Sequence, residues 1–128
     1  MNNGLGISFV STGFPSPAED FSQLSISLDK HLIYNKAATF MAHANGRSMI
    51  NSGIDDGDIL IIDRSLNARN GDIIIALLNG EFLVKELSII NNELFLIPKN
   101  SKYSPLKISR EMDFEIWGVV TYSIHKLR

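Results

Sequence analysis

Apolar and polar residues follow each other in short runs along most of the chain, and turn residues separate these runs. The runs are rich in β-branched and aromatic residues, which favour strands. Asn79-Gly80 predicts a tight hairpin turn, because these residue types tolerate positive φ. Strands are predicted over residues 37–44, 58–63, 72–78 and 81–90, a hairpin over 91–98, and a long final strand over 114–124. Short strands with turns at near-regular spacing predict a mostly antiparallel β architecture.

Three other features lie outside or interrupt this strand pattern. Residues 28–35 predict a short helix, with Asp29 near its start. Gly118, inside the last predicted strand, indicates a bulge or a close backbone contact. Residues 1–24 contain glycines and prolines but no helix or strand pattern, so they are predicted to form a flexible arm outside the core.

Composition narrows the possible functions. The 128 residues, 45% hydrophobic and 20% charged, fit one globular domain. The formal net charge of −2 disfavours direct nucleic-acid binding, which calls for a basic surface. The absence of cysteine excludes thiol catalysis and thiolate metal sites. No apolar run approaches the ~20 residues of a membrane span, and the N-terminus lacks the basic region of a signal peptide. A cytoplasmic protein without a membrane segment is therefore expected.

Residues 45–58 form a segment rich in glycine and in Asn or Asp. It contains Ser48, a candidate nucleophile. Gly46 precedes Ser48 and permits unusual backbone angles. A serine on such a turn can present its hydroxyl outward, with nearby backbone N–H groups as oxyanion donors. Serines in segments of this composition are more commonly turn formers. The segment alone therefore leaves both interpretations open.

A nucleophilic serine needs a base, which a histidine or a lysine can supply. Lys85 shares one face of its predicted strand with Leu83 and Leu87, so burial of that face would lower the pKa of the lysine. The alternative is an edge strand, from which the lysine reaches water. No histidine stands beside an obvious acidic partner in the sequence; the three are His31, His43 and His125.

Five sequence motifs, taken together, add a resemblance to a known family. They are "GFPSPAED", "GRSMI" followed by "GIDDGDILIIDRS", "GDIIIALLNGEFLVKEL", "IPKNSKYSPLKIS" and "IWGVV". In this order they resemble the UmuD, MucA and ImpA group of LexA-like self-cleaving peptidases, from Gly13 to near the C-terminus. The resemblance implies a LexA/UmuD C-terminal-like fold of twisted antiparallel sheets with one or two short helices. Residues 1–24 would be the arm with the cleavage motif, and residues 25–128 the peptidase-like domain.

The resemblance also implies an activity and its residues. Ser48 matches the nucleophile and Lys85 the neutral general base, with the backbone N–H groups of Arg47 and Ser48 as oxyanion donors. The cut would fall between Thr12 and Gly13, stimulated by a RecA filament on single-stranded DNA. The shortened product, a homodimer, would join a UmuC-type error-prone polymerase. No cofactor or metal is implied.

Two residues depart from the family pattern, and four alternative functions remain. Thr12 stands where the family usually has alanine or cysteine, and Arg47 where relatives more often have an acidic or small residue.

The main alternative is a non-enzymatic β-rich interaction module. The others are a peptidase acting on other proteins, a LexA- or phage-type repressor, and a metal or phosphate site at Asp55, Asp56 and Asp58. The absence of a helix-turn-helix pattern argues against the repressor.

Overall fold

The computed structural model describes residues 27–46, 53–98 and 104–128. The chain divides into two compact units, Met1–His31 and Leu32–Arg128. The predicted arm and its boundary at residue 24 lie outside the described residues. The predicted helix is confirmed in a shorter form as α1 (Leu28–Leu32). At its start the Ser27 carbonyl accepts the N–H of His31 at 3.1 Å.

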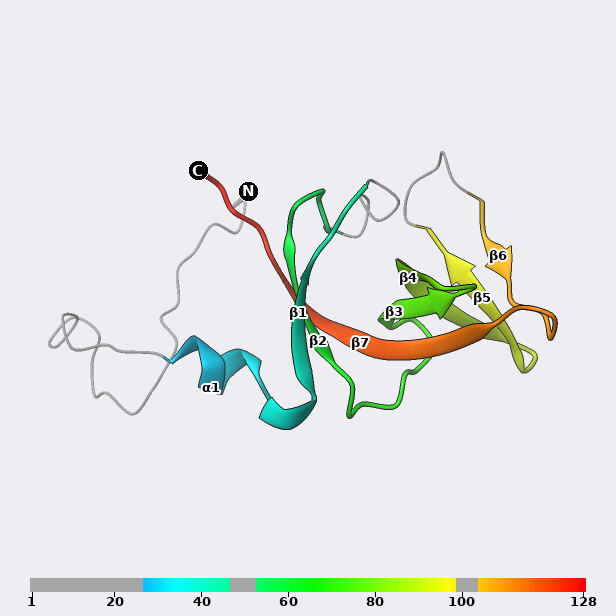
Figure 1. Cartoon of the computed structure of the whole chain (residues 1–128), viewed down its shortest axis with the longest axis horizontal. Helices are drawn as coiled ribbons and strands as arrows, with labels where there is room; N and C mark the ends of the chain where they lie inside the picture. Colours follow the sequence, from blue (N-terminus) through cyan, green and yellow to red (C-terminus); the bar gives the residue numbers. More distant parts are fainter. Residues whose placement is uncertain (1–26, 47–52, 99–103) are drawn as a thin grey trace, which may run out of the picture. The chain divides into compact units, whose positions relative to one another are not determined.

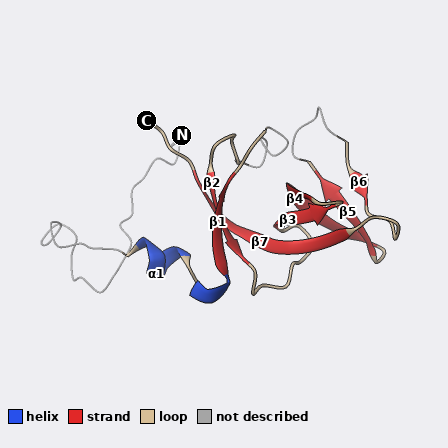
Figure 2. Ribbon diagram, viewed as in Figure 1, coloured by secondary structure: helices blue, strands red, loops and turns tan. Residues whose placement is uncertain are grey.

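The described part of the second unit is mainly one antiparallel sheet (Figures 1 and 2). The strand order is β1-β2-β7-β3-β4-β5-β6. The 3-10 helix η2 (Lys36–Ala38) precedes it, and the strands are β1 (Thr39–His43), β2 (Ile59–Asp63), β3 (Ile73–Leu78), β4 (Glu81–Ile90), β5 (Glu93–Ile97), β6 (Leu106–Lys107) and β7 (Phe114–Ile124). The predicted mostly β fold is confirmed. Strand β6 was not predicted, because two residues are too few to show an alternating pattern.

Tight turns join the consecutive strands β3, β4 and β5, as their residue types predict. Asn79 and Gly80 have φ values of 49° and 87° between β3 and β4. Asn91 and Asn92 have φ values of 52° and 63° between β4 and β5. Both pairs adopt the positive φ of hairpin turns whose twist matches that of the strands. These turns pair β4 with both neighbours and place it inside the sheet.

The long strand β7 connects the two halves of the sheet, because it pairs with β2 on one side and β3 on the other. Its register shifts opposite Ile61 and Ile62, and again opposite Ile75 and Ala76. Such bulges bend a strand and increase its twist. Figure 1 shows the consequence: β7 curves across the unit from the β3–β5 half to the β1–β2 half. The bulge predicted from Gly118 is confirmed at the second shift.

Two buried apolar clusters lie on the two faces of β3. Ile75 belongs to the first cluster, while Ile74 and Ala76 belong to the second, because successive strand residues point to opposite faces. The first cluster consists of Ala44, Ile54, Leu60, Ile62 and Ile75, and the second of Ile74, Ala76, Leu78, Leu87 and Leu96. The first cluster lies next to the segment that leads from β1 to β2, and it forms the floor of the site described below.

Candidate active site

Lys85 lies near the middle of β4, just before the part of β4 that pairs with β5. Its cross-strand neighbour on β3 is Ile74, which has no exposed surface. Leu87, two residues further along the same face of β4, is equally buried. Lys85 itself is half-buried, and loss of hydration lowers the pKa of its ammonium group. Strand β4 pairs with β5 only from Glu86 onward, so within the described sheet Lys85 has a strand partner on the β3 side alone. Its partial burial, rather than its position in the sheet, favours the buried-face interpretation over a lysine that reaches water.

A cavity of about 400 Å³ opens beside Lys85. Apolar side chains of the first cluster, including Ile62 and Ile75, line it together with Trp117. The chain leaving β1 also lines the cavity, as far as Gly46. The residues that line the cavity therefore include Lys85, whose pKa is lowered, several apolar side chains and the backbone that leads to the predicted nucleophile.

Phe82 and Trp117 line one part of the cavity, and Phe40 of β1 packs against Trp117. The ring of Trp117 lies 5.2 Å from that of Phe40 and 5.5 Å from that of Phe82, measured between centroids. The guanidinium carbon of Arg64 lies 4.2 Å from the Trp117 ring centroid, and its Nε donates to the Trp117 carbonyl at 2.7 Å. Stacking and cation–π contacts of this kind hold the indole in one orientation. The position of the Trp117 ring is therefore fixed by its neighbours, although Phe82 remains 61% exposed.

The chain segments that flank residues 47–52 are joined by hydrogen bonds. The Ala44 N–H donates to the Asp58 carbonyl at 2.8 Å, and the Gly57 N–H donates to the Ala44 carbonyl at 2.7 Å. Beyond this backbone pairing, the Gly46 N–H donates to Oδ1 of Asp56 at 2.9 Å. We call this arrangement of residues 44–46 and 55–58 the stem. It continues the β1–β2 pairing, which ends at His43 and Ile59.

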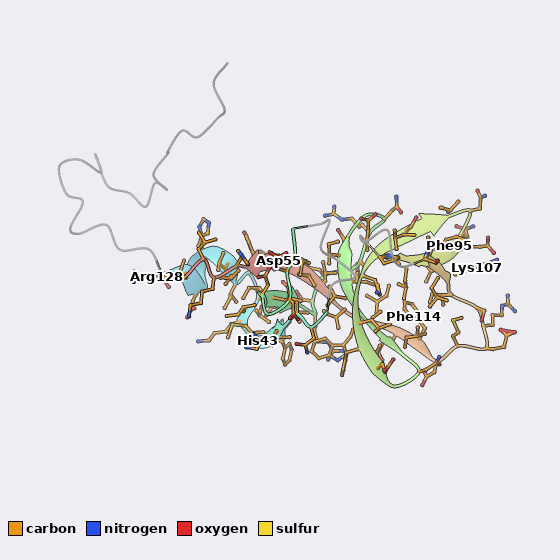
Figure 3. The ribbon with its side chains drawn as sticks, turned by 90° about the horizontal axis from the view of Figure 1, so that it is seen from above. His43, Asp55, Phe95, Lys107, Phe114 and Arg128 are labelled. Atoms are coloured by element: carbon orange, nitrogen blue, oxygen red, sulfur yellow. The ribbon has the colours of Figure 1, made fainter. Side chains whose placement is uncertain are left out.

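The carboxylate of Asp58 ties the stem to the end of β7. Its Oδ2 accepts the Asp55 N–H at 2.8 Å and the Ser123 hydroxyl at 3.0 Å, and its Oδ1 lies 2.7 Å from Nδ1 of His125. The Asp55 N–H, His125 and Ser123 lower the pKa of Asp58. The hydrogen bond with Asp58 in turn raises the pKa of His125. Figure 3 labels His43 and Asp55, which lie in this half of the unit, away from Phe95 and Phe114.

This pairing of His125 with an acid is absent from the sequence pattern, since 67 positions separate the two residues. The fold brings them together because Ile59 of β2 pairs with Ile124 of β7. The Ser123 hydroxyl is bonded to Asp58 and not to His125, so these three residues are not arranged as a Ser-His-Asp triad. The side chains of Asp56 and Asp58 both accept hydrogen bonds from backbone N–H groups of this region, those of Gly46 and Asp55.

Substitution of His125 by glutamine should reduce stability in a pH-dependent way. Protonated His125 stabilises the folded state fully below its ordinary pKa of 6.5, and this contribution is lost as pH rises through the raised folded value. Asp58, with a lowered pKa, contributes above its ordinary value of 3.8. The stability lost by His125→Gln should therefore be larger at about pH 5.5 than at about pH 9. Urea unfolding at both pH values measures it, and an equal loss at both would contradict the prediction.

The structure brings together only some of the predicted site residues. Lys85 lines the same cavity as residues 44–46 of the stem. Ser48 and Arg47 lie outside the described residues, as do Thr12 and Gly13. Sequence reasoning did not anticipate Trp117 as a cavity wall, and the only available signal was its place beside the bulge-forming Gly118.

Comparison with known proteins decides the family. A family model described as Peptidase S24-like matches residues 6–121. The chain belongs to the Peptidase S24-like family. MucA of Salmonella typhimurium is 37% identical over 116 residues, which cover 90% of this chain and 79% of MucA. SamA of Salmonella typhimurium strain LT2 is 40% identical over 116 residues, covering 91% and 80% of the two chains.

A more distant relative of this S24-like chain is a repressor. The LexA repressor of Stenotrophomonas maltophilia is 33% identical over 110 residues, which cover 86% of this chain and 52% of the repressor. The resemblance to the UmuD, MucA and ImpA group of LexA-like peptidases is therefore confirmed. Among the described residues, no helix is long and apolar enough to cross a membrane.

Proposed function

We propose that this S24-like chain is a self-cleaving serine peptidase of SOS mutagenesis, which cuts its own arm between Thr12 and Gly13. Ser48 is the nucleophile and Lys85 the general base. The observation that carries this proposal is the half-buried Lys85 beside an apolar cavity, with its pKa lowered by burial. A lysine in such an environment is neutral at lower pH than an exposed one, and only the neutral amine accepts a proton.

In the proposed reaction, a single proton moves between the dyad and the leaving amine. Lys85 takes the proton of the Ser48 hydroxyl as the oxygen attacks the carbonyl carbon of Thr12. The backbone N–H groups of Arg47 and Ser48 donate to the oxyanion. When the C–N bond breaks, protonated Lys85 returns the proton to the amine of Gly13. Water then hydrolyses the ester on Ser48, and Lys85 again accepts and returns a proton.

The apolar cavity supports the arm as the substrate of this reaction. Phe14 directly follows the proposed cut, and its ring matches an apolar surface walled by Trp117. Gly13 imposes little steric demand at the cut, and Pro15 keeps the segment out of a helix. Thr12 is bulkier than the alanine or cysteine usual at this position, so a slower cut than in such relatives is expected.

The shortened chain would act through protein partners. We propose that contact with a RecA filament on single-stranded DNA stimulates the cut, and that the product forms a homodimer. This dimer would then serve as the accessory subunit of a UmuC-type error-prone polymerase. The formal net charge of −2 supports this division of roles, in which the partners bind the nucleic acid.

Mass spectrometry tests the self-cleavage. The chain is incubated at mildly alkaline pH, with and without RecA filaments on single-stranded DNA, beside Ser48→Ala and Lys85→Ala variants. We expect fragments that end at Thr12 and begin at Gly13 from the parent, faster with filaments, and neither fragment from the variants. An unchanged parent mass under all conditions would favour the non-enzymatic interaction module. Cleavage that persists in Ser48→Ala would identify another protease.

A further inference from the structure

The backbone at Gly46 needs an external constraint to hold one conformation. Its φ of 91° lies in the region that favours glycine, and open space surrounds the position a Cβ would take. Glycine loses more conformational freedom on ordering than any other residue. The backbone pairing of the stem ends at Ala44, two residues earlier. Among the described contacts, the next hydrogen bond along this side of the stem is the one that the Gly46 N–H donates to the Asp56 carboxylate.

Asp56 can act as an anchor because its own turn is fixed. Within that turn the Asp58 N–H donates to the Asp55 carbonyl at 3.1 Å, and the Asp55 N–H returns a bond to the Asp58 carboxylate. Asp58 as a whole is only 3% exposed. Ser123 and His125 tie it to β7, which spans both halves of the sheet. Asp56 therefore belongs to a turn that is hydrogen-bonded, through Asp58, to Ser123 of β7 and to His125.

Gly46 and Lys85 line the same cavity from different chain segments. Ser48 follows Gly46 by two residues, so the backbone direction at Gly46 determines where the next residues begin. We infer that Asp56 is a positioning residue for cleavage, whose carboxylate holds the backbone at Gly46 and thereby aligns Ser48 with Lys85. This inference rests on the proposed function. It gives Asp56 a role that the sequence alone did not suggest.

Self-cleavage of Asp56→Ala tests this role in the full chain. A displacement of about 1 Å at a reacting group can cost on the order of 100-fold in rate, so we expect cleavage to slow by about 10- to 100-fold. Asp56→Asn should recover most of the rate, because asparagine keeps a side-chain oxygen acceptor. The matched control is Asp113→Ala, which removes an exposed aspartate outside the cavity lining and should cut at the parent rate.

The pH profile separates positioning from a charge effect on Lys85. A positioning residue lowers the rate by the same factor at every pH and leaves the midpoint of the profile unchanged. If Asp56 acted through its charge, its removal would lower the pKa of Lys85 and move the midpoint to lower pH. A moved midpoint would therefore overturn the inference, as would cleavage of Asp56→Ala at the parent rate.

Amide hydrogen exchange at Gly46 distinguishes failure of the inference from failure of the proposed function. We expect faster exchange at Gly46 in Asp56→Ala than in the parent and in Asp113→Ala. If the parent is cut but Asp56→Ala shows the parent's exchange rate at Gly46, Asp56 does not hold the Gly46 backbone and the inference is wrong, while the proposed function stands. If exchange accelerates but the parent is never cut, the proposed function is wrong and the positioning role is overturned with it.

Discussion

Replacing Lys85 by methionine is expected to slow self-cleavage by about 10²–10⁴-fold, the usual contribution of a general base. Methionine preserves much of the length and apolar packing of the lysine stem, so the sheet should form as in the parent. In the parent, the cleavage rate should rise with pH as the amine loses its proton. Because burial lowers the pKa, the midpoint should lie below the ordinary value of 10.5. Cleavage followed by mass spectrometry across a pH series measures both quantities.

Lys107→Met is the matched control for this variant. Lys107 lies on the short strand β6, outside the cavity lining, where its ammonium is 2.7 Å from a carboxylate oxygen of Glu93. This control should cut at the parent rate. Comparable loss of cleavage in both variants, or a Lys85→Met rate equal to that of the parent, would contradict the role of Lys85 as general base.

Stability provides an independent test of the burial of Lys85. Because its folded pKa is lowered, the unfolded chain binds more protons than the folded chain between the two pKa values, and stability rises with pH in that window. The Lys85→Met variant lacks this contribution. The stability of the parent relative to Lys85→Met should therefore increase with pH as it passes through the lowered folded pKa. Denaturant unfolding at two alkaline pH values detects the change, and a constant difference would contradict the burial.

Gly118→Ala is expected to destabilise the fold by about 1–3 kcal/mol, the usual cost of overpacking a core. A Cβ built at Gly118 would lie 2.5 Å from Cγ2 of Ile62. Ile62 is only 2% exposed and belongs to the first buried cluster, so its stiff β-branched side chain has little room to move. Urea unfolding of parent and variant measures the loss.

A double variant identifies the cause of this destabilisation. Ile62→Leu removes the Cγ2 branch that the new methyl group would meet while preserving the side-chain volume. Combined with Gly118→Ala, it should cost less than the sum of the two single changes, because the residues are in direct contact. Additive losses would show that the close approach to Ile62 is not what requires glycine at this position.

The local elements of the fold could be predicted from the sequence because neighbouring residues determine them. Short runs rich in β-branched and aromatic residues located the strands that became β1 to β5 and β7, and Asn79-Gly80 marked a turn whose φ values only a few residue types adopt readily. Gly118 also signalled a bulge, although the contact that excludes a side chain there is with Ile62 of a distant strand. Sequence motifs also indicated the family, which the comparison confirmed. For the site, they predicted Lys85 as the base.

Tertiary structure decided which of these elements meet. No local pattern states that β7 lies between β2 and β3, because strand order depends on how apolar faces pack between distant segments. That order places His125 beside Asp58 and Trp117 at the cavity wall. The hydrogen bond of Asp56 to Gly46 likewise depends on the closing of the stem. The sequence alone therefore determined the strands and the candidate dyad, whereas packing of distant strands built the cavity and the supports around it.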